Sequence, residues 1–271
     1  MKKILTLFAV LLAFSACLSA QEGKNIRTDV ISVAMFEANY AFQMPALDTK
    51  VSFGVNSTIG GSFGYKTDEN WLWTANVNYI FGKKVKGDRV DLLGEGITTV
   101  DGELIGGGGS LVTLAVYQRG WHFQAELGKV FPFYGNPNSG ILVQAGLGYL
   151  LNRIRIEYDK NLYNTPYPVE GDYEYGYDRM RGGPAFHGEV GYLYLGDTRL
   201  LNFSIALEVT YARTRPLRDY DFRVFTNPAT GQLEPVGRID PNTRYNDLYY
   251  GIRFNWLIPT YQRQPEVFYY D

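Results

Sequence analysis

The chain has 271 residues, of which 45% are hydrophobic and 15% aromatic, and its formal net charge is -2. The balanced charge, with no run of lysine and arginine, excludes a nucleic-acid-binding surface that follows a phosphate backbone. The one cysteine, Cys17, lies close to the N-terminus, so disulfides and thiol catalysis are excluded for the mature chain.

The first residues are typical of a secretory signal peptide. Two lysines precede an apolar run over residues 4–14, and small residues end the segment at Ala20. We therefore expect residues 1–20 to be cleaved, which would remove Cys17. A second interpretation stays open, because the stretch FSAC at 14–17 loosely resembles a lipobox, in which Cys17 would be lipidated. No later apolar run reaches the about 18 residues of a transmembrane helix.

Apolar and polar residues alternate with a period of two along almost all of the mature sequence. Most of these segments are longer than a strand of a soluble protein, and they match the roughly 9–11 residues of a strand that crosses a bilayer at a tilt. The predicted strands cover residues 31–44, 51–65, 71–83, 109–131, 139–157, 183–196, 200–214 and 245–259.

The connections between these strands alternate between short and long. The short turns hold the Asn, Asp, Gly and Pro that tight turns require, and they lie at 66–70, 131–139 and 195–199. The long polar connections lie at 84–108, 158–182 and 215–244. An up-and-down barrel with both termini in the periplasm has this order of short periplasmic turns and long extracellular loops. The first connection, near Pro45, is short and is the exception.

The segment 109–131 decides the number of strands. If it is a hairpin that turns at Gln118-Arg119-Gly120, the chain has nine strands and long loops at both ends. If it is one long strand, the number is eight and the short and long connections alternate. We therefore predict an all-β fold, a transmembrane up-and-down antiparallel β-barrel of eight strands over residues 21–259, with ten strands as the alternative. A soluble β-sandwich explains the alternation equally well, but it does not explain the signal peptide, the strand lengths and the loop order together.

One face of each predicted strand is apolar and aromatic. In a membrane barrel this face contacts lipid, with Trp and Tyr at the two interfaces. Phe53 and Val55 begin the lipid-facing set of the second strand. The predicted membrane-interface aromatics are Tyr65, Trp71, Trp73 and Trp256.

The other face is polar and is predicted to line a lumen that side chains nearly fill, so an open diffusion pore is not expected. Its ionisable residues form a predicted polar network of Glu37, His122, Glu126, His187, Glu189, Glu208 and Arg253. The first and last strands pair to close the barrel, and counting from their periplasmic ends puts Glu37 and Arg253 at one level, where they would form a charge-assisted pair. A gated proton or ion path is the alternative role of this network.

Four of these residues are of types that bind zinc: His122, Glu126, His187 and Glu189. They lie on the fourth and sixth predicted strands, and we expect the fifth strand to hold them too far apart for one metal ion. Both histidines point away from lipid, and Ser62 and Ser204 have no base at a matching height, so no catalytic site is expected. No cofactor is expected, because no helix follows the glycines at 106–109 to receive a phosphate.

The long loops carry the expected contacts outside the membrane. Arg153 and Arg155 stand just above the predicted membrane, where they are placed to contact lipopolysaccharide phosphates. The segment EGDYEYGYDRMRGG at 170–183 is acidic and rich in tyrosine, which fits either a solvated loop or a binding surface.

The chain continues beyond the last predicted strand, which ends near Pro259. Outer-membrane barrels usually end in an aromatic residue that closes the final strand, whereas here a tail at 260–271 follows it. We interpret this periplasmic tail either as a frayed end or as a partner contact made by Phe268, Tyr269 and Tyr270.

Three stretches carry a family resemblance. They are NWLWTANVNYIFG at 70–82, GNPNSGILVQAGLGYL at 135–150 and YYGIRFNWLIPTYQRQPEVFYY at 249–270. With the signal peptide, they resemble the small outer-membrane β-barrel proteins of Bacteroidota, the broad PorT-like and OmpA-membrane-domain-like group. The resemblance spans nearly all of the mature chain and implies the barrel fold. It also implies roles as accessory subunits of secretion or outer-membrane assembly complexes, as structural proteins or as adhesins, and it assigns no residue role.

The sequence therefore predicts a non-enzymatic integral outer-membrane barrel that serves as a structural or accessory subunit of an envelope complex. Its expected partners are outer-membrane lipid, lipopolysaccharide and envelope proteins, without nucleic acid. A narrow channel or small-ligand transporter is the first alternative, and a lipid-modifying outer-membrane enzyme is the second.

Overall fold

The computed structural model describes residues 26–106, 109–133, 135–158, 171–197 and 200–260. The predicted signal peptide at 1–20, with Cys17, lies outside the described residues. So do the tail residues for which a partner contact is predicted, Phe268, Tyr269 and Tyr270.

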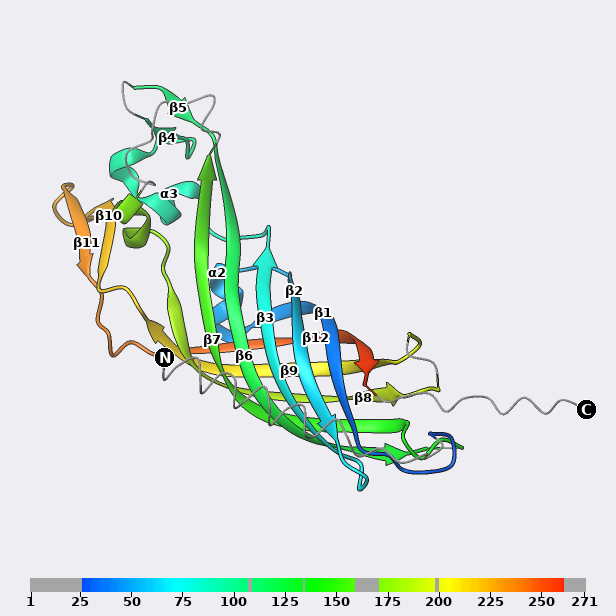
Figure 1. Ribbon diagram of the computed structural model, residues 1–271. Coiled ribbons are helices and arrows are strands. Elements are labelled where there is room, and N and C mark those ends of the chain that lie inside the picture. Colours follow the sequence, from blue (N-terminus) through cyan, green and yellow to red (C-terminus); the bar gives the residue numbers. More distant parts are fainter. Residues whose placement is uncertain (1–25, 107–108, 134, 159–170, 198–199, 261–271) are drawn as a thin grey trace, which may run out of the picture.

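Eight antiparallel strands form a closed barrel, in which the first strand pairs with the last (Figure 1). Their order around the barrel is β1-β12-β9-β8-β7-β6-β3-β2. The strands are β1 (Val33–Ala46), β2 (Asn56–Lys66), β3 (Trp71–Gly82), β6 (Leu114–Pro132), β7 (Gly140–Tyr158), β8 (Arg181–Tyr194), β9 (Phe203–Pro216) and β12 (Tyr245–Pro259). The eight-strand antiparallel barrel predicted from the sequence is confirmed.

β6 is a single strand of 19 residues that continues through Gln118, Arg119 and Gly120. It pairs with β3 as far as Gln118 and with β7 as far as Leu114. The alternative hairpin within this segment is therefore wrong, and so is the barrel of ten strands.

Successive residues of each strand point alternately into the barrel and away from it. In β1, Glu37 and Asn39 are buried, whereas Phe36 and Tyr40 are 56% and 47% exposed. In the middle of the barrel, polar side chains lie inside and large apolar side chains lie outside, which is the reverse of the order in a soluble β-sandwich.

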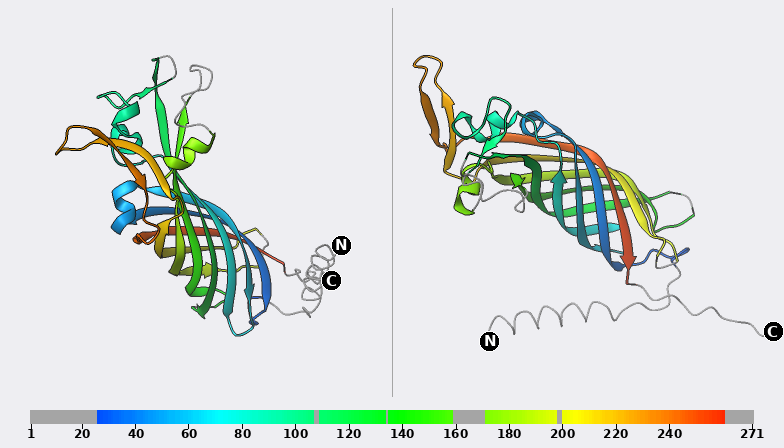
Figure 2. Two further views of the ribbon diagram at one scale, coloured as in Figure 1. Left: turned by 90° about the vertical axis from the view of Figure 1, so that its left-hand side faces the viewer. Right: turned by 90° about the horizontal axis from the view of Figure 1, so that it is seen from above.

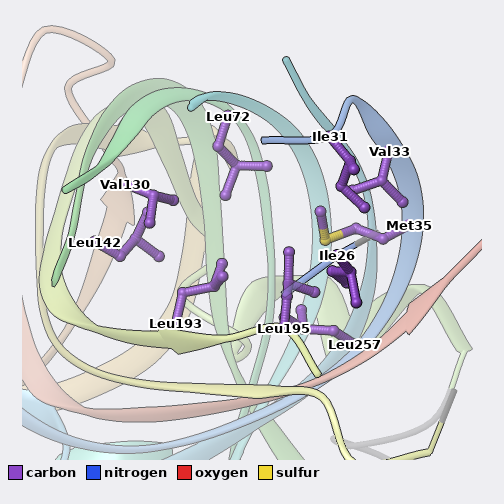
Figure 3. Packing of buried hydrophobic residues seen from close by; sticks show 10 residues of the cluster. All are labelled: Ile26, Ile31, Val33, Met35, Leu72, Val130, Leu142, Leu193, Leu195 and Leu257. Atoms are coloured by element: carbon purple, nitrogen blue, oxygen red, sulfur yellow. The ribbon is translucent and has the colours of Figure 1, made fainter. Parts of the chain in front are cut away.

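The short turns gather at one end of the barrel, which we call the turn end; the longer connections gather at the opposite loop end (Figures 1 and 2). An apolar cluster fills the turn end, with side chains that come from the barrel wall, from the β8–β9 turn and from the segment before β1 (Figure 3). The cluster contains Ile26, Ile31, Val33, Met35, Leu72, Val130, Leu142, Leu193, Leu195 and Leu257. Full burial of an aliphatic side chain contributes about 1.5–3 kcal/mol, so a small hydrophobic core closes this end.

Asn138, in the turn between β6 and β7, holds the segment before β1 against this cluster. Its Nδ2 donates to the carbonyl oxygens of Ile26 at 2.8 Å and Asp29 at 2.7 Å. Its Oδ1 accepts from the Ile31 backbone N–H and from Lys66 Nζ, each at 2.9 Å. Lys66 Nζ also donates to the Ile31 carbonyl oxygen at 3.1 Å. The buried amide and ammonium therefore depend on this segment for their hydrogen bonds.

The connections at the loop end fold into a cap with its own hydrophobic core. They contain α2 (Leu47–Ser52), α3 (Arg89–Leu93), the 3-10 helices η1 (Glu95–Ile97) and η3 (Gly171–Gly176), and the hairpins of β4 (Leu104–Ile105) with β5 (Leu111–Val112) and of β10 (Tyr220–Thr226) with β11 (Leu233–Arg238). The buried side chains of the cap are Phe53, Leu92, Leu93, Leu104, Val112, Leu114, Ile154, Ile156 and Tyr177. In the described part of the chain, no helix has the length and hydropathy to cross a membrane.

The prediction that Phe53 faces lipid, on a strand that begins at residue 51, is wrong. The chain forms α2 before β2 begins at Asn56, and Phe53 turns into the cap core, where it is 3% exposed. Thr49 anchors α2 to β12 by donating a hydrogen bond from its hydroxyl to Asp247 at 2.7 Å. The alternation of apolar and polar residues continues through Phe53, so the sequence pattern does not show that the strand begins only at Asn56.

Polar contacts join the loop-end connections to one another. Arg218 donates to both carboxylate oxygens of Asp178, with the shortest distance 2.7 Å, and these hydrogen bonds raise the pKa of Arg218. The backbone N–H and the hydroxyl of Thr226 both donate to Glu95 Oε2. The cap is therefore an ordered unit formed by loops that are distant in the sequence.

Asn138→Ala is expected to loosen the segment before β1, because it removes the four hydrogen bonds described above. Each such bond contributes about 0.5–1.5 kcal/mol, and more where the donor is charged. The measurement is amide hydrogen exchange of the folded protein in detergent, in which residues 26–33 should exchange faster than in the unaltered protein. Asn242→Ala, at an exposed loop position, is the control and should leave this exchange unchanged. Equal exchange in all three proteins would contradict the role of Asn138.

Candidate functional site in the barrel lumen

Ionisable side chains from five strands meet in the lumen between the turn-end cluster and the cap. They are Glu37 on β1, His122 and Glu126 on β6, His187 and Glu189 on β8, Glu208 on β9, and Arg253 on β12. Each is no more than 8% exposed. Each takes an inward position of the two-residue alternation, so the local sequence fixes the side to which it points.

Glycines on neighbouring strands make room for these side chains. Gly146 on β7 opposes Glu126, and a Cβ atom there would lie 2.6 Å from Glu126 Cγ. A Cβ atom on Gly64 of β2 would lie 2.9 Å from Glu37 Oε1. A larger residue at Gly64 would press on the Glu37 carboxylate. One at Gly146 would clash with the Ala125 carbonyl oxygen as well as with Glu126. The two glycines therefore make room for the charged cluster.

Arg253 is the cation of this cluster. Its Nε lies 2.6 Å from Glu208 Oε2 and 3.8 Å from Glu189 Oε2. Glu208 also accepts a hydrogen bond from Gln43 Nε2 at 2.6 Å. Arg253 therefore joins β12 to β9 and β8 across the lumen by charge-assisted contacts.

The prediction that Glu37 pairs with Arg253 is wrong. In the β1–β12 register, Arg253 opposes Ala41, whereas Glu37 opposes Leu257. Glu37 instead accepts a hydrogen bond from Ser62 Oγ at 2.8 Å. The strands of a barrel are tilted and staggered against one another. Two residues at the same distance from the ends of their strands therefore need not lie at the same height, and Glu37 and Arg253 do not.

His187 connects β8 with β6 and β9. Its Nδ1 lies 2.8 Å from the Thr210 hydroxyl and its Nε2 lies 3.5 Å from Glu126 Oε1. The ring centroids of His187 and His122 are 6.0 Å apart. β7 puts no side chain between Glu126 and His187, because Gly146 opposes both of them. Even so, within the described ranges no three His, Cys, Asp or Glu side chains are grouped to hold a metal ion.

Thr210, His187 and Glu126 line up as a hydroxyl, an imidazole and a carboxylate, which is the order of groups in nucleophilic catalysis. Thr210 is 1% exposed, His187 is 0% exposed and Glu126 is 6% exposed. All three side chains are therefore almost fully buried in the lumen. The two serines weighed from the sequence have other partners: Ser62 donates to Glu37, and Ser204 accepts from Asn255 Nδ2 at 2.8 Å.

A second polar layer lies toward the loop end, and the sequence analysis missed it. The Tyr249 hydroxyl accepts hydrogen bonds from Asn152 Nδ2 at 2.7 Å and from Gln118 Nε2 at 3.1 Å. Tyr249 is 1% exposed and packs in a cluster with Ile80 and Leu150. This aromatic ring and its amide partners occupy the lumen above the charged cluster.

Asp247 forms the centre of the next contacts toward the cap. Its carboxylate accepts from Thr49 at 2.7 Å and from Thr214 at 2.6 Å, and it lies 3.3 Å from Arg181 Nη2. Asp247 and Tyr249 stand two and four positions after Tyr245 on β12, with the same inward parity as Arg253. That parity is the sequence signal that identifies them.

The predicted interface aromatics lie on the outer wall near the turn end. Tyr65 and Trp73 oppose each other on β2 and β3 and are 40% and 56% exposed. Lys129 Nζ lies 4.7 Å from the centroid of the Trp71 ring, and Trp256 Nε1 donates to the Leu200 carbonyl oxygen at 2.9 Å.

A second aromatic group lies further toward the loop end and includes Trp121, which the sequence analysis did not single out. The rings of Trp121 and Tyr79 lie side by side on β6 and β3, with centroids 5.0 Å apart. Trp121 is 44% exposed. The outer wall therefore has aromatic side chains on both sides of its aliphatic middle.

No protein-family model matches the chain, and no curated protein matches it. Among solved structures, it is similar to Ail, the attachment invasion locus protein of Yersinia pestis, with 8% identity and a TM-score of 0.36 over 83% of this chain and 99% of that chain. A structure of Ail in complex with the heparin analogue sucrose octasulfate gives 10% identity and a TM-score of 0.34, with the same coverage. Neisserial surface protein A gives 13% identity and a TM-score of 0.34, over 81% of this chain and 95% of that chain. These similarities concern the fold alone, and membership of the PorT-like group stays a prediction.

Arg253→Met is expected to lower the free energy of unfolding by about 3–5 kcal/mol, because it leaves the buried Glu208 and Glu189 carboxylates without their cation. The measurement is urea unfolding of the protein in lipid vesicles, followed by tryptophan fluorescence. Adding Glu208→Gln to this variant should recover part of the loss. Arg238→Met, at an exposed position of β11, is the control. An Arg253→Met protein as stable as this control would show that the cluster does not hold the barrel together.

Proposed function

We propose that the protein is an integral outer-membrane β-barrel without catalytic activity, which serves as a structural or accessory subunit of an envelope complex. The observation that carries the membrane part of this proposal is the inverted barrel. The middle of its wall exposes large apolar side chains, while the seven ionisable side chains at the same height are buried inside. Exposed apolar area on this scale is typical of a protein in contact with lipid.

The middle of the outer wall is aliphatic. Leu147, Leu207 and Ile252 are 70%, 67% and 56% exposed on β7, β9 and β12. On β9, Phe203 and Tyr211 flank this middle part. The about 8 residues between them, at about 3.3 Å each and tilted by about 40°, span roughly 20 Å, close to the apolar band of about 25 Å in outer-membrane barrels.

Cations on the outer wall support an orientation. Beyond the aliphatic belt, toward the loop end, arginines lie on the outward faces of three strands: Arg119 on β6, Arg153 and Arg155 on β7, and Arg213 and Arg215 on β9. Guanidinium groups at this height are placed to contact lipopolysaccharide phosphates. We therefore place the loop end outside the cell and both termini in the periplasm.

The lumen supports a role other than transport. The apolar cluster and the segment held by Asn138 fill the turn end, the ion pairs of Arg253 cross the middle, and Tyr249 lies above them. A conducting pore needs a continuous hydrated path, whereas these three layers fill the interior of a barrel of only eight strands. The buried Thr210–His187–Glu126 arrangement has no access for a lipid substrate, so we assign it a structural role.

The parts that remain for function are the cap and the tail. The cap exposes aromatic side chains on an ordered scaffold: Tyr173, Tyr175 and Tyr220 are 40%, 47% and 41% exposed. Aromatic and arginine side chains are enriched among residues that dominate protein interfaces. A subunit that presents an ordered surface on one side of the membrane and a tail on the other fits a role in a complex.

Leu207→Arg tests the membrane assignment. An arginine at the middle of the belt should lower the free energy of unfolding in phosphatidylcholine vesicles by about 2–4 kcal/mol, because its guanidinium must lose water or extend toward the interface. The measurement is reversible urea-dependent folding into these vesicles. Leu233→Arg is the matched control, since Leu233 on β11 is also exposed, at 56%, but stands outside the belt. If both variants fold with the free energy of the unaltered protein, the belt does not contact lipid.

Affinity purification tests the accessory role. A version tagged in the 227–232 turn of the β10–β11 hairpin, extracted gently from outer membranes, should bring along an envelope protein in a stoichiometric amount, identified by mass spectrometry. Deletion of residues 260–271 should remove that protein if the tail holds it and should retain it if the cap does. A monodisperse barrel without a partner, together with single-channel conductance in planar bilayers, would instead favour the channel.

A further inference from the structure

Two arginines of the cap converge on one backbone oxygen. Arg179, between η3 and β8, donates from Nη2 to the Asp91 carbonyl oxygen, and Arg223 of β10 donates from Nη1 to the same oxygen at 2.8 Å. Asp91 belongs to α3, which lies beside β10 at the loop end (Figures 1 and 2). A carbonyl oxygen carries no formal charge, so this contact brings two cations together without neutralising either.

Arg223 has its own counter-ion. Its Nε and Nη2 donate to Asp221, with distances of 2.9 Å and 2.6 Å. Arg218 of the cap is hydrogen-bonded to Asp178 in the same way, and Arg181, at the start of β8, forms an ion pair with Asp247 at 3.3 Å.

Arg179 is different. Among the described residues, no carboxylate lies within 4.0 Å of its guanidinium, and its Nε is buried without an acceptor. Burial lowers the pKa of Arg179 to about 10, and the neighbouring Arg223 adds to this effect. Arg181 also lowers this pKa, whereas the carboxylates of Asp221 and Asp91 act in the opposite direction. A partly buried guanidinium without an ion pair is less stable than a paired one.

The geometry suits an anionic ligand. Both hydrogen bonds to the Asp91 oxygen lie at the exposed surface of the cap. Arg179 Nε is buried, so a solute would contact the terminal Nη groups of the two arginines. A guanidinium presents a planar fork of donors that matches the oxygen atoms of phosphate, sulfate and carboxylate groups. An oxyanion between Arg179 and Arg223 would supply the missing charge and reduce the repulsion between the two cations.

We propose that Arg179 and Arg223 form an oxyanion-binding site on the surface of the cap, at the junction of the connections that contain α3, η3 and β10. Its ligand is a phosphate, sulfate or carboxylate group. The site joins three loops, so its ligand also stabilises their arrangement. This proposal stands apart from the accessory role, because a barrel with or without a protein partner presents the same arginines.

The test uses the full-length folded protein in a neutral detergent, titrated with inorganic phosphate and with sulfate by calorimetry at constant ionic strength. We expect one site per chain and slower amide exchange of residues 88–95 and 174–180 when phosphate is bound. Arg179→Gln should weaken binding by at least about tenfold, since it removes a charged donor. Arg179→Lys keeps the positive charge but loses the planar pair of guanidinium donors. Its affinity for phosphate should lie between those of the unaltered protein and Arg179→Gln.

Arg238→Gln is the matched control, because it makes the same change at an exposed arginine on the neighbouring β11. It should bind phosphate as the unaltered protein does. Migration of the unheated protein on a denaturing gel reports whether each variant is folded. Absence of binding, or equal affinity in Arg179→Gln and Arg238→Gln, overturns the proposal.

Nanodiscs distinguish the sources of the oxyanion. In phosphatidylcholine nanodiscs the phosphate affinity should equal that in detergent. If lipid A in the nanodisc abolishes phosphate binding to the unaltered protein, a lipid headgroup occupies the site. If lipid A leaves the phosphate affinity unchanged, the ligand comes from solution. Both outcomes support the site, and they differ only in the source of the oxyanion.

Discussion

The width of an eight-strand barrel constrains every inward residue of this chain. Such a lumen is nearly filled by side chains, so each large polar residue needs a small neighbour, as Glu126 has in Gly146 and Glu37 has in Gly64. The same limit brings the charges into contact. Arg253 lies 2.6 Å from Glu208 and 3.8 Å from Glu189, residues of two other strands, because no side chain in so narrow a lumen can turn away from the rest.

The two ends of the lumen are filled by different chemistry. At the turn end, aliphatic side chains pack together and Asn138 satisfies the backbone of the segment that covers them. Toward the loop end, the layers are polar: Tyr249 with its amide partners, and then Asp247 with Thr49, Thr214 and Arg181. If the wall faces lipid, as we propose, neither the membrane nor bulk water supplies counter-ions to the cluster between these ends. The carboxylates of Glu208 and Glu189 then depend on Arg253 as their counter-ion, which is why we expect its substitution to lower the free energy of unfolding strongly.

The parts of this structure that the sequence predicted are those that depend on local order. Alternation shows which side of a strand a residue occupies, so all the ionisable residues expected in the lumen, from Glu37 to Arg253, are found buried. Contacts across the barrel depend on stagger and on which neighbours are glycine, and neither follows from alternation. Glu37 therefore pairs with Ser62 rather than Arg253, and Glu126 approaches His187 across β7. The cap was not predicted, because its core joins residues as distant as Phe53 and Tyr177.

Arg253 and Arg179 show how differently the wall and the cap use the same side chain. Arg253 lies in the lumen among carboxylates, in a position that only the folded barrel can create, and its charge is used up by internal contacts. Arg179 lies at the surface of a cap in which its neighbours each have a carboxylate and it has none within 4.0 Å among the described residues. A charge that is neutralised internally stabilises the fold, whereas a cation without a counter-ion at a reachable surface favours a ligand. The distribution of counter-ions therefore assigns stability to the lumen and recognition to the cap.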